Sequence, residues 1–370
     1  MLIPLLGFAA FFLAFSNGAN DNFKGFATIW GSASLSYRRA LLLATAATMA
    51  GGLVSLLLAG ALVEQFSGKG LVPDALAGTP SFALAVAVAA AMTVILATRL
   101  GFPVSTTHAL VGGLIGAGVA NGLGDLDFGM LGSSFVLPLL SSPLLSAGIS
   151  FGIYLALRLR RPPGTSDDEG CICLVEDEAI GRLSTGGTMA SRRHIGSYAP
   201  RLVIAAAAAC DDGPVPVART SIALLRDGAH LFSATTICFA RGVNDTPKLA
   251  ALLIGAGLFG GAYSTLAITV AMALGGLLLA RRVAETMCFK INRLDPVQGI
   301  WANLTTAALV LGASRLGLPV STTHVSVGSI IGIGAAAGTL DLSTVRNVLL
   351  SWVATLPVAA GIAYLIASLA

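Results

Sequence analysis

Apolar runs long enough to cross a bilayer follow one another along most of the chain, and one polar stretch interrupts them. A helix needs about 20 apolar residues to cross the hydrocarbon core. The pattern predicts ten segments at membrane depth, near residues 2–19, 40–63, 81–98, 103–120, 130–157, 222–242, 249–280, 297–313, 319–338 and 345–369. Several of these are short and lie beside Gly and Pro, which favours broken or re-entrant helices over simple rods.

The same pattern divides the chain into three parts. We expect a first transmembrane repeat over residues 1–157, a central loop or insert over 158–221, and a second transmembrane repeat over 222–370. Arginines near residues 38, 158 and 281 fall on one side of the membrane if the amino terminus lies outside. Basic loops favour the cytoplasm. We therefore expect a multi-pass integral protein of the prokaryotic plasma membrane, with its central loop in the cytoplasm.

Composition excludes the common soluble classes. Apolar residues make up 55% of the chain and charged residues 11%, whereas soluble domains carry about 25% charged residues. A soluble enzyme, a disordered chain and a nucleic-acid binder are therefore excluded. The 44 glycines suit helices that pack closely in lipid.

Two polar blocks recur in the same order in both halves. PVSTTH occurs at Pro103–His108 and again, unchanged, at Pro319–His324. GANDNFK at Gly18–Lys24 is matched by GVNDTPK at Gly242–Lys248. Duplicated halves with five segments each would have opposite orientations, as in the inverted repeats of secondary transporters. We predict an all-α polytopic membrane protein of two inverted-topology repeats, with broken or re-entrant half-helices meeting at the membrane midplane.

The PVSTTH blocks have the features of anion sites. Gly101 and Pro103 would end an incoming helix, and Ser105 and Ser321 are good N-cap residues for a half-helix that follows. Such a helix start exposes unpaired N–H groups and the positive end of the helix dipole, which bind phosphate-like anions. The hydroxyls expected to contribute are those of Ser105, Thr106, Thr107, Ser321, Thr322 and Thr323. Helix capping alone is the alternative for a single copy, but two copies favour binding.

The second pair of blocks places charges at membrane depth, where ionisable residues are functional by default. Oxygens of Asn20, Asp21, Asn244 and Asp245 suit a hard cation such as Na⁺, together with carbonyls of helices unwound near the two glycines of the blocks. The residues for a possible Na⁺ are the aspartates, Asp21 and Asp245.

Lys24 and Lys248 each follow an aspartate by three residues and would share its helix face. They are candidate phosphate ligands, and the alternative is an internal Asp–Lys ion pair that locks the two halves. His108 and His324, one turn into the half-helices, could relay protons or hydrogen-bond to a neighbouring helix.

Together these blocks resemble the inorganic phosphate transporter (PiT) family, and the resemblance covers nearly the whole chain outside the central insert. It implies an all-helical inverted repeat, often dimeric, that takes up phosphate with Na⁺ or H⁺. By the family's pattern, residues 105–107 and 321–323 would hold phosphate, and the Asn–Asp pairs would hold the cation. The family signature continues GANDVAN, whereas this chain has Asn22-Phe23-Lys24 and Thr246-Pro247-Lys248. A lysine ammonium could occupy the place of a bound cation or pair with the anion, which favours proton coupling or an altered cation stoichiometry.

Other functions are weighed against this one. Gly148–Gly152 matches the G-x-S-x-G pattern of hydrolases but lies in an apolar helix, where close packing explains it better. Cys171 and Cys173, expected as reduced thiols, lack the partners of a zinc site. A cation-only exchanger would leave the two anion sites unused. A membrane-embedded hydrolase would not need two copies of its polar blocks.

The sequence thus predicts a transporter and not an enzyme, with no catalytic residue and no cofactor beyond the coupling ion, Na⁺ or H⁺. Its expected partners are inorganic phosphate, the coupling cation, the lipid bilayer and a second copy of the chain in a homodimer, with no nucleic acid. Sulfate or another tetrahedral oxyanion is the alternative substrate. The function of the central insert does not follow from the sequence.

Overall fold

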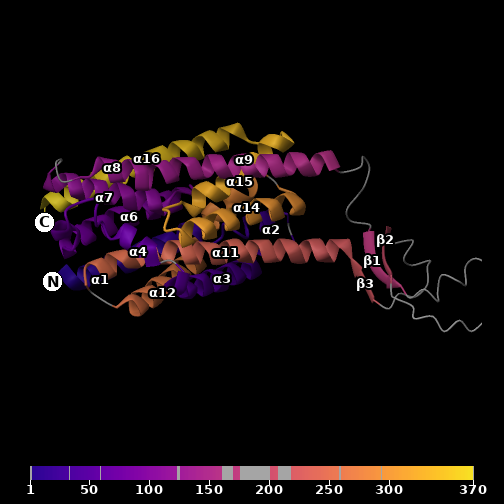
Figure 1. The fold of residues 1–370 in the computed structure, drawn as a ribbon, viewed down its shortest axis with the longest axis horizontal. Helices are drawn as coiled ribbons and strands as arrows, with labels where there is room; N and C mark the ends of the chain where they lie inside the picture. The colour runs from indigo at the N-terminus through magenta and orange to yellow at the C-terminus, as the bar shows by residue number, and fades with distance from the viewer. Residues whose placement is uncertain are drawn as a thin grey trace, which may run out of the picture. The chain divides into compact units, whose positions relative to one another are not determined.

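The computed structural model describes residues 2–32, 34–58, 60–122, 126–160, 170–175, 201–206, 218–257, 260–292 and 294–369. Two compact units form: one comprises Met1–Leu159 with His230–Ala370, and the other comprises Arg160–Ala229. The first unit is helical and contains all the candidate site residues (Figure 1).

The first half of the chain supplies helices α1 to α9. They are α1 (Leu2–Asp21), α2 (Ala27–Gly31), α3 (Tyr37–Leu58), α4 (Gly60–Phe66), α5 (Asp74–Ala77), α6 (Pro80–Leu100), α7 (Thr106–Asn121), α8 (Phe128–Met130) and α9 (Leu137–Arg160). A π-helical turn, Leu131–Val136, joins α8 to α9. The second half supplies α11 (Ile222–Gly255), α12 (Gly261–Leu279), α13 (Arg281–Glu285), a π-helical turn (Thr286–Ile291), α14 (Pro296–Arg315), α15 (Thr322–Ala337) and α16 (Leu342–Leu369).

Six described helices are long and apolar enough to cross a membrane: residues 2–21, 37–58, 80–100, 128–159, 261–279 and 342–369. The equivalent helices α7 and α15 have 16 residues each. At ~1.5 Å per residue they are shorter than a ~30 Å hydrocarbon core. They are therefore half-helices, as the pattern of breakers predicts, rather than full spans.

One predicted boundary is wrong. The two segments expected at 222–242 and 249–280 are instead the single long helix α11, followed by α12 (Figure 1). Pro247 lies inside α11 and is buried. A proline in a membrane helix is tolerated where packed neighbours satisfy the backbone groups that it frees, so Pro247 does not end this helix.

Close backbone contacts connect the two halves in a reciprocal way. A Cβ on Gly18 of α1 would overlap the Met272 carbonyl of α12, and a Cβ on Gly242 of α11 would overlap the Thr48 carbonyl of α3. Gly18 and Gly242 are equivalent positions in the two repeats, and on the same alignment Thr48 is equivalent to Met272. This exchange of partners is what an approximate two-fold relation between the halves produces.

The half-helices pack in the same crossed manner. A Cβ on Gly116 of α7 would overlap the Ala360 carbonyl of α16, and one on Gly332 of α15 would overlap the Ala147 carbonyl of α9. Small residues allow these backbones to approach, as is common between membrane helices. The last helix of each half therefore covers the half-helix of the other half.

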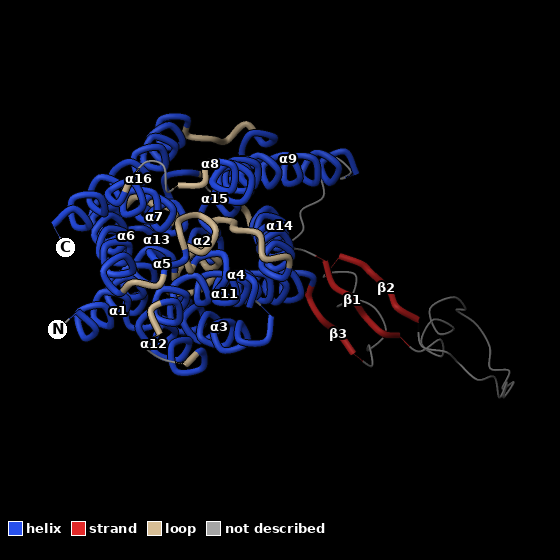
Figure 2. Tube along the Cα trace, turned by 60° about the vertical axis from the view of Figure 1, so that its left-hand side comes forward, coloured by secondary structure: helices blue, strands red, loops and turns tan. Residues whose placement is uncertain are grey.

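The second unit contains a small antiparallel sheet in the order β2-β1-β3 (Figure 2). Its strands are β1 (Gly170–Val175), β2 (Arg201–Ala206) and β3 (Ala218–Ser221), with Cys171 opposite Ala205 and Ser221. Cys171 is disulfide-bonded, so the expectation of a reduced thiol is wrong at this position. The acidic residues 176–178, which could have joined it at a metal, lie outside the described residues.

Candidate functional site

Each half-helix begins as the sequence predicts. Ser105 accepts a hydrogen bond from the backbone N–H of His108 at 3.0 Å, and Ser321 accepts one from His324 at 3.2 Å. These are N-cap bonds, so the capping role of both serines is confirmed. Before each cap, Gly101 and Gly317 adopt positive φ angles of 79° and 69°, which lets the chain leave the preceding helix and turn.

The two Asn–Asp pairs themselves lie on helices. Helix α1 continues through Gly18 and ends at Asp21, whereas α11 continues through Gly242 and beyond Lys248. The expected unwinding is therefore wrong in the second half, and in the first half the chain leaves the helix after Asp21, over residues 22–26. Glycine is required at both positions because a neighbouring backbone carbonyl occupies the space of a side chain.

The two asparagines of these blocks hold the loops that precede the half-helices. Asn20 donates to the Thr98 hydroxyl at 2.9 Å and accepts from the Val104 N–H at 3.2 Å. Asn244 accepts from the Ser314 hydroxyl at 3.0 Å and donates to the Val320 carbonyl at 3.3 Å. Both amides thus bind protein groups, and their role as cation ligands stays a prediction.

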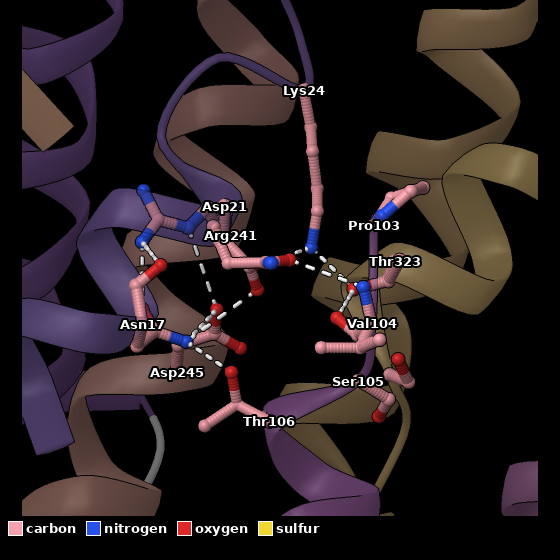
Figure 3. Close-up of polar contacts among 12 residues, drawn as sticks. Asn17, Asp21, Lys24, Pro103, Val104, Ser105, Thr106, Arg241, Asp245 and Thr323 are labelled. Carbon is pink, nitrogen blue, oxygen red and sulfur yellow. Dashed lines mark hydrogen bonds and ion pairs between the residues drawn. The ribbon is translucent and has the colours of Figure 1, made fainter. Parts of the chain in front are cut away.

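The two lysines reach across to the opposite half-helix. Lys24 Nζ lies 2.5 Å from Asp21 Oδ1 and donates to the Thr323 hydroxyl of α15 (Figure 3). Lys248 Nζ donates to the Thr107 hydroxyl of α7 at 3.2 Å and to the Val320 carbonyl at 2.5 Å. The anticipated Asp–Lys ion pair therefore forms in the first half, where the lysine also contacts the other half.

In the second half, Asp245 pairs with an arginine. Arg241 Nε lies 3.5 Å from Asp245 Oδ2, and an Arg241 Nη donates to the Asn17 side-chain oxygen at 2.7 Å (Figure 3). Both Arg241 and Asn17 are buried. Neither residue was expected at the site from the sequence. The signal that could have found them is their equivalence in the two repeats, where each precedes an aspartate by one helical turn.

Asn17 connects the aspartates to the first half-helix. Its amide nitrogen lies 3.0 Å from the Thr106 hydroxyl, 3.3 Å from Asp245 and 3.4 Å from Asp21. Figure 3 shows Asn17, Asp245 and Thr106 facing one another below Arg241. The two Asn–Asp blocks and the first PVSTTH block therefore meet at one place, although long stretches of sequence separate them.

The two histidines contact each other. The His108 and His324 rings have centroids 4.3 Å apart at an interplanar angle of 82°, and His324 stacks on Trp352 at 3.9 Å. Trp352 in turn donates to the Pro103 carbonyl at 3.0 Å. Among the described residues, the ring nitrogens of His324 have no hydrogen-bond partner. The rings pack beside the half-helix loops, and proton relay stays a prediction.

The buried charges do not balance. In their ordinary ionised forms, Asp21 and Asp245 supply two negative charges and Lys24, Lys248 and Arg241 supply three positive ones, and all five are at most 4% exposed. The starts of α7 and α15 add further positive potential. An unbalanced charge in a low-dielectric interior is costly, and cations at helix starts are unfavourable. The arrangement is therefore suited to an anion bound between the lysines and the half-helices.

The hydroxyls singled out in the sequence line the same region. All six, Ser105, Thr106, Thr107, Ser321, Thr322 and Thr323, are at most 6% exposed. Three of them make contacts that join distant parts of the chain: Thr106 to Asn17, Thr107 to Lys248 and Thr323 to Lys24. The structure thus brings both pairs of motifs together in one buried polar cluster.

A family model and several known proteins match nearly the whole chain. The model of the "Phosphate transporter family" matches residues 17–363. A Pyrococcus abyssi protein named as a putative phosphate permease is 29% identical, with 97% of this chain and 95% of that protein covered. The chloroplastic inorganic phosphate transporter 2-1 of Arabidopsis thaliana is 29% identical, with 95% and 69% covered.

A solved structure shares the fold. It is titled "The sodium-dependent phosphate transporter", is 22% identical and superposes with a TM-score of 0.74 over 100% of this chain and 98% of that one. This likeness shows that the two chains share a fold. The family match spans both copies of each motif, the helices between them and the central insert. The chain is a member of the phosphate transporter family.

Proposed function

We propose that this protein is a secondary active transporter of inorganic phosphate that uses alternating access and a coupling cation. One observation carries the proposal: the two lysine ammoniums contact threonines at the starts of opposed half-helices, in reciprocal fashion. Lysines and helix starts are both phosphate-binding groups. Phosphate held there would contact both halves at once. A relative movement of the halves would therefore change the side of the membrane from which the phosphate can be reached.

The nearby carboxylates favour phosphate over sulfate. Near pH 7 phosphate still carries a proton and can donate a hydrogen bond to a carboxylate, whereas sulfate cannot. Asp245 and Asp21 share the amide of Asn17 with Thr106 of the first half-helix. They are thus near enough to the proposed anion site to accept such a bond. Sulfate remains the alternative substrate of the same fold.

The arrangement of charges supports H⁺ over Na⁺ as the coupling ion. Asp21 has one carboxylate oxygen on Lys24 and the other near Asn17. Asp245 is bound by Asn244, Asn17 and Arg241. A Na⁺ ion would have to displace these donors and occupy their space. A proton needs no such space, because it can bind to a carboxylate oxygen and release the donor paired with that oxygen.

The reciprocal packing supports the inverted repeat and its role. The first half contributes α1, α3, the half-helix α7 and α9, and the second half contributes α11, α12, the half-helix α15 and α16. The last helix of each half covers the half-helix of the other half. We propose a homodimer in the plasma membrane of a prokaryotic cell, with the central insert in the cytoplasm because of the arginines near residues 38, 158 and 281. The disulfide at Cys171 is the observation against this side, since disulfides are rare in the cytosol. The proposed phosphate ligands are the six hydroxyls and Lys24 with Lys248, and the proposed coupling residues are Asp21 and Asp245.

Phosphate uptake into proteoliposomes tests the proposal. Labelled phosphate is supplied with a Na⁺ gradient or with an inward H⁺ gradient, with and without excess sulfate, and protein-free liposomes serve as the control. We expect uptake driven by the H⁺ gradient that sulfate does not suppress. Uptake that requires Na⁺ would refute proton coupling, and entry of labelled sulfate in place of phosphate would refute the substrate.

A further inference from the structure

A basic cavity lies beside the central site, against α6, α12 and α13. It has a volume of about 580 Å³ and is lined by Thr98, Arg99, Arg281, Arg282, Glu285 and two leucines of α12. We call it the arginine vestibule. Three arginines against one glutamate leave a net positive charge, which favours an anion.

The arginines are arranged as a group. Arg282 donates to the Arg99 carbonyl at 2.7 Å, which holds α13 against the end of α6. Arg281 pairs with Glu285 at 3.0 Å, and these two side chains are 71% and 43% exposed. Each guanidinium has five N–H donors in a fork that fits a phosphate group. Among the described residues these contacts use only a few of the donors, which leaves others that can bind an anion in the cavity.

The vestibule is next to the proposed phosphate site. Thr98 lines the cavity and is itself buried. Its hydroxyl accepts the hydrogen bond of Asn20, whose neighbour in the chain is Asp21. One hydrogen bond therefore separates the vestibule wall from the charged cluster of the central site.

The opposite half has less basic charge at the equivalent place. Arg315 is the equivalent of Arg99 and occupies the same position in its repeat. Alignment of the two repeats on their Asn–Asp blocks makes Leu57 and Leu58 the equivalents of Arg281 and Arg282. Leu57 is 85% exposed. The pair of arginines at the start of α13 is therefore present in one half alone among these equivalent positions, which argues that its charge is not a general requirement of the fold.

We propose that the arginine vestibule binds the phosphate group of the incoming anion and delivers it to the central site from one membrane face. The inference rests on the proposed function. A lipid headgroup offers the same chemistry, because its phosphate would also bind a fork of arginines at the membrane surface. The experiment must therefore distinguish free phosphate from lipid phosphate.

The test compares Arg99→Gln/Arg281→Gln with the parent in proteoliposomes of zwitterionic lipid, and repeats the comparison in vesicles that also contain anionic lipid. Arg315→Gln is the matched control, since Arg315 is the equivalent of Arg99 at the end of α14. Phosphate uptake is measured at low and at high ionic strength. We expect the double variant to raise the KM for phosphate about tenfold at low salt with unchanged kcat. The difference should shrink at high salt, because salt screens exposed charges.

Each result decides the question. The KM shift in purely zwitterionic vesicles supports recruitment of free phosphate. A shift that appears only with anionic lipid identifies a headgroup site and overturns the proposal, as does an equal shift in Arg315→Gln or no shift at all. Absence of uptake by the parent refutes the proposed function instead. A second measurement then still tests the vestibule. Phenylglyoxal modifies arginines, and mass spectrometry shows whether inorganic phosphate protects Arg99 and Arg281 from it. The absence of protection would overturn the proposal for the vestibule.

Discussion

The Thr323 hydroxyl donates a hydrogen bond of 2.7 Å to the backbone carbonyl of Val104, which belongs to the other half of the chain. The equivalent bond, from Thr107 to the Val320 carbonyl, is 3.4 Å long. Each half-helix thus begins by holding the loop that leads into the other one. Both halves together therefore determine the geometry of the polar cluster. A displacement of one loop must also displace the start of the opposite half-helix, which is bonded to it.

Replacing Thr323 by valine should impair phosphate transport. The change keeps the volume but removes the hydroxyl that contacts Val104 and Lys24. Loss of such a bond costs about 1–3 kcal/mol, so we expect kcat/KM for phosphate uptake to fall about tenfold to a hundredfold. Thr323→Ser keeps the hydroxyl and should retain most of the activity. Equal uptake by the valine variant and the parent would contradict a role for this residue.

Asp21→Asn should destabilise the protein strongly. It leaves the buried Lys24 ammonium without its carboxylate at 2.5 Å. Breaking one side of a buried ion pair costs about 3–5 kcal/mol, which thermal unfolding in detergent would detect. The double variant Asp21→Asn/Lys24→Met should recover much of this loss but not uptake. Glu285→Gln, which breaks an exposed pair with Arg281, should change stability by about 0–1 kcal/mol. Similar losses for the two single variants would rule out this account.

Gly18→Ala tests the close packing of the halves. The added methyl would overlap the Met272 carbonyl, a backbone group that cannot move aside as a side chain can. Overpacking of this kind costs about 1–3 kcal/mol or more, so the Tm should fall. Gly7→Ala in the same helix meets nothing within 4 Å and should be neutral or stabilising, since alanine favours helices. If both variants unfold at the same temperature, the proposed contact is not tight.

Asp341 should make stability depend on pH in acid. Hydrogen bonds from the Ser343 hydroxyl and from Thr344 hold the pKa of Asp341 below its ordinary value. A lowered pKa in the folded state means that its contribution is complete above about pH 4 and is lost as the pH falls further. Asp341→Ala should lower the Tm at neutral pH and show a smaller further loss in acid than the parent. Parallel pH profiles would exclude this role.

The parts of the fold that could be predicted depend on residues close together in sequence. The serine caps form within four residues, and the Asp21–Lys24 pair joins residues three apart in sequence. The duplication also marks equivalent positions without any structure. These signals predict the half-helices and those members of the buried cluster that belong to the repeated motifs.

What could not be predicted depends on contacts between distant segments. Lys248 donates to Thr107 and to the Val320 carbonyl instead of pairing with Asp245, and Asp245 forms its ion pair with Arg241. Nothing near Arg241 in sequence indicates that Asn17 lies beside it. The continuity of α11 through Pro247 likewise depends on neighbours packed around it, which a local breaker signal does not include.

The two halves hold one equivalent segment in two different shapes. After Asp21 the chain leaves the helix over residues 22–26 and resumes as α2, whereas the equivalent residues 246–255 stay within α11. If transport exchanges the shapes of the two halves, α1 and α2 straighten into one rod while α11 bends near Pro247, where the helix already lacks a hydrogen bond. The opposite-facing conformation can then be built from this structure by giving each half the backbone that its counterpart has now.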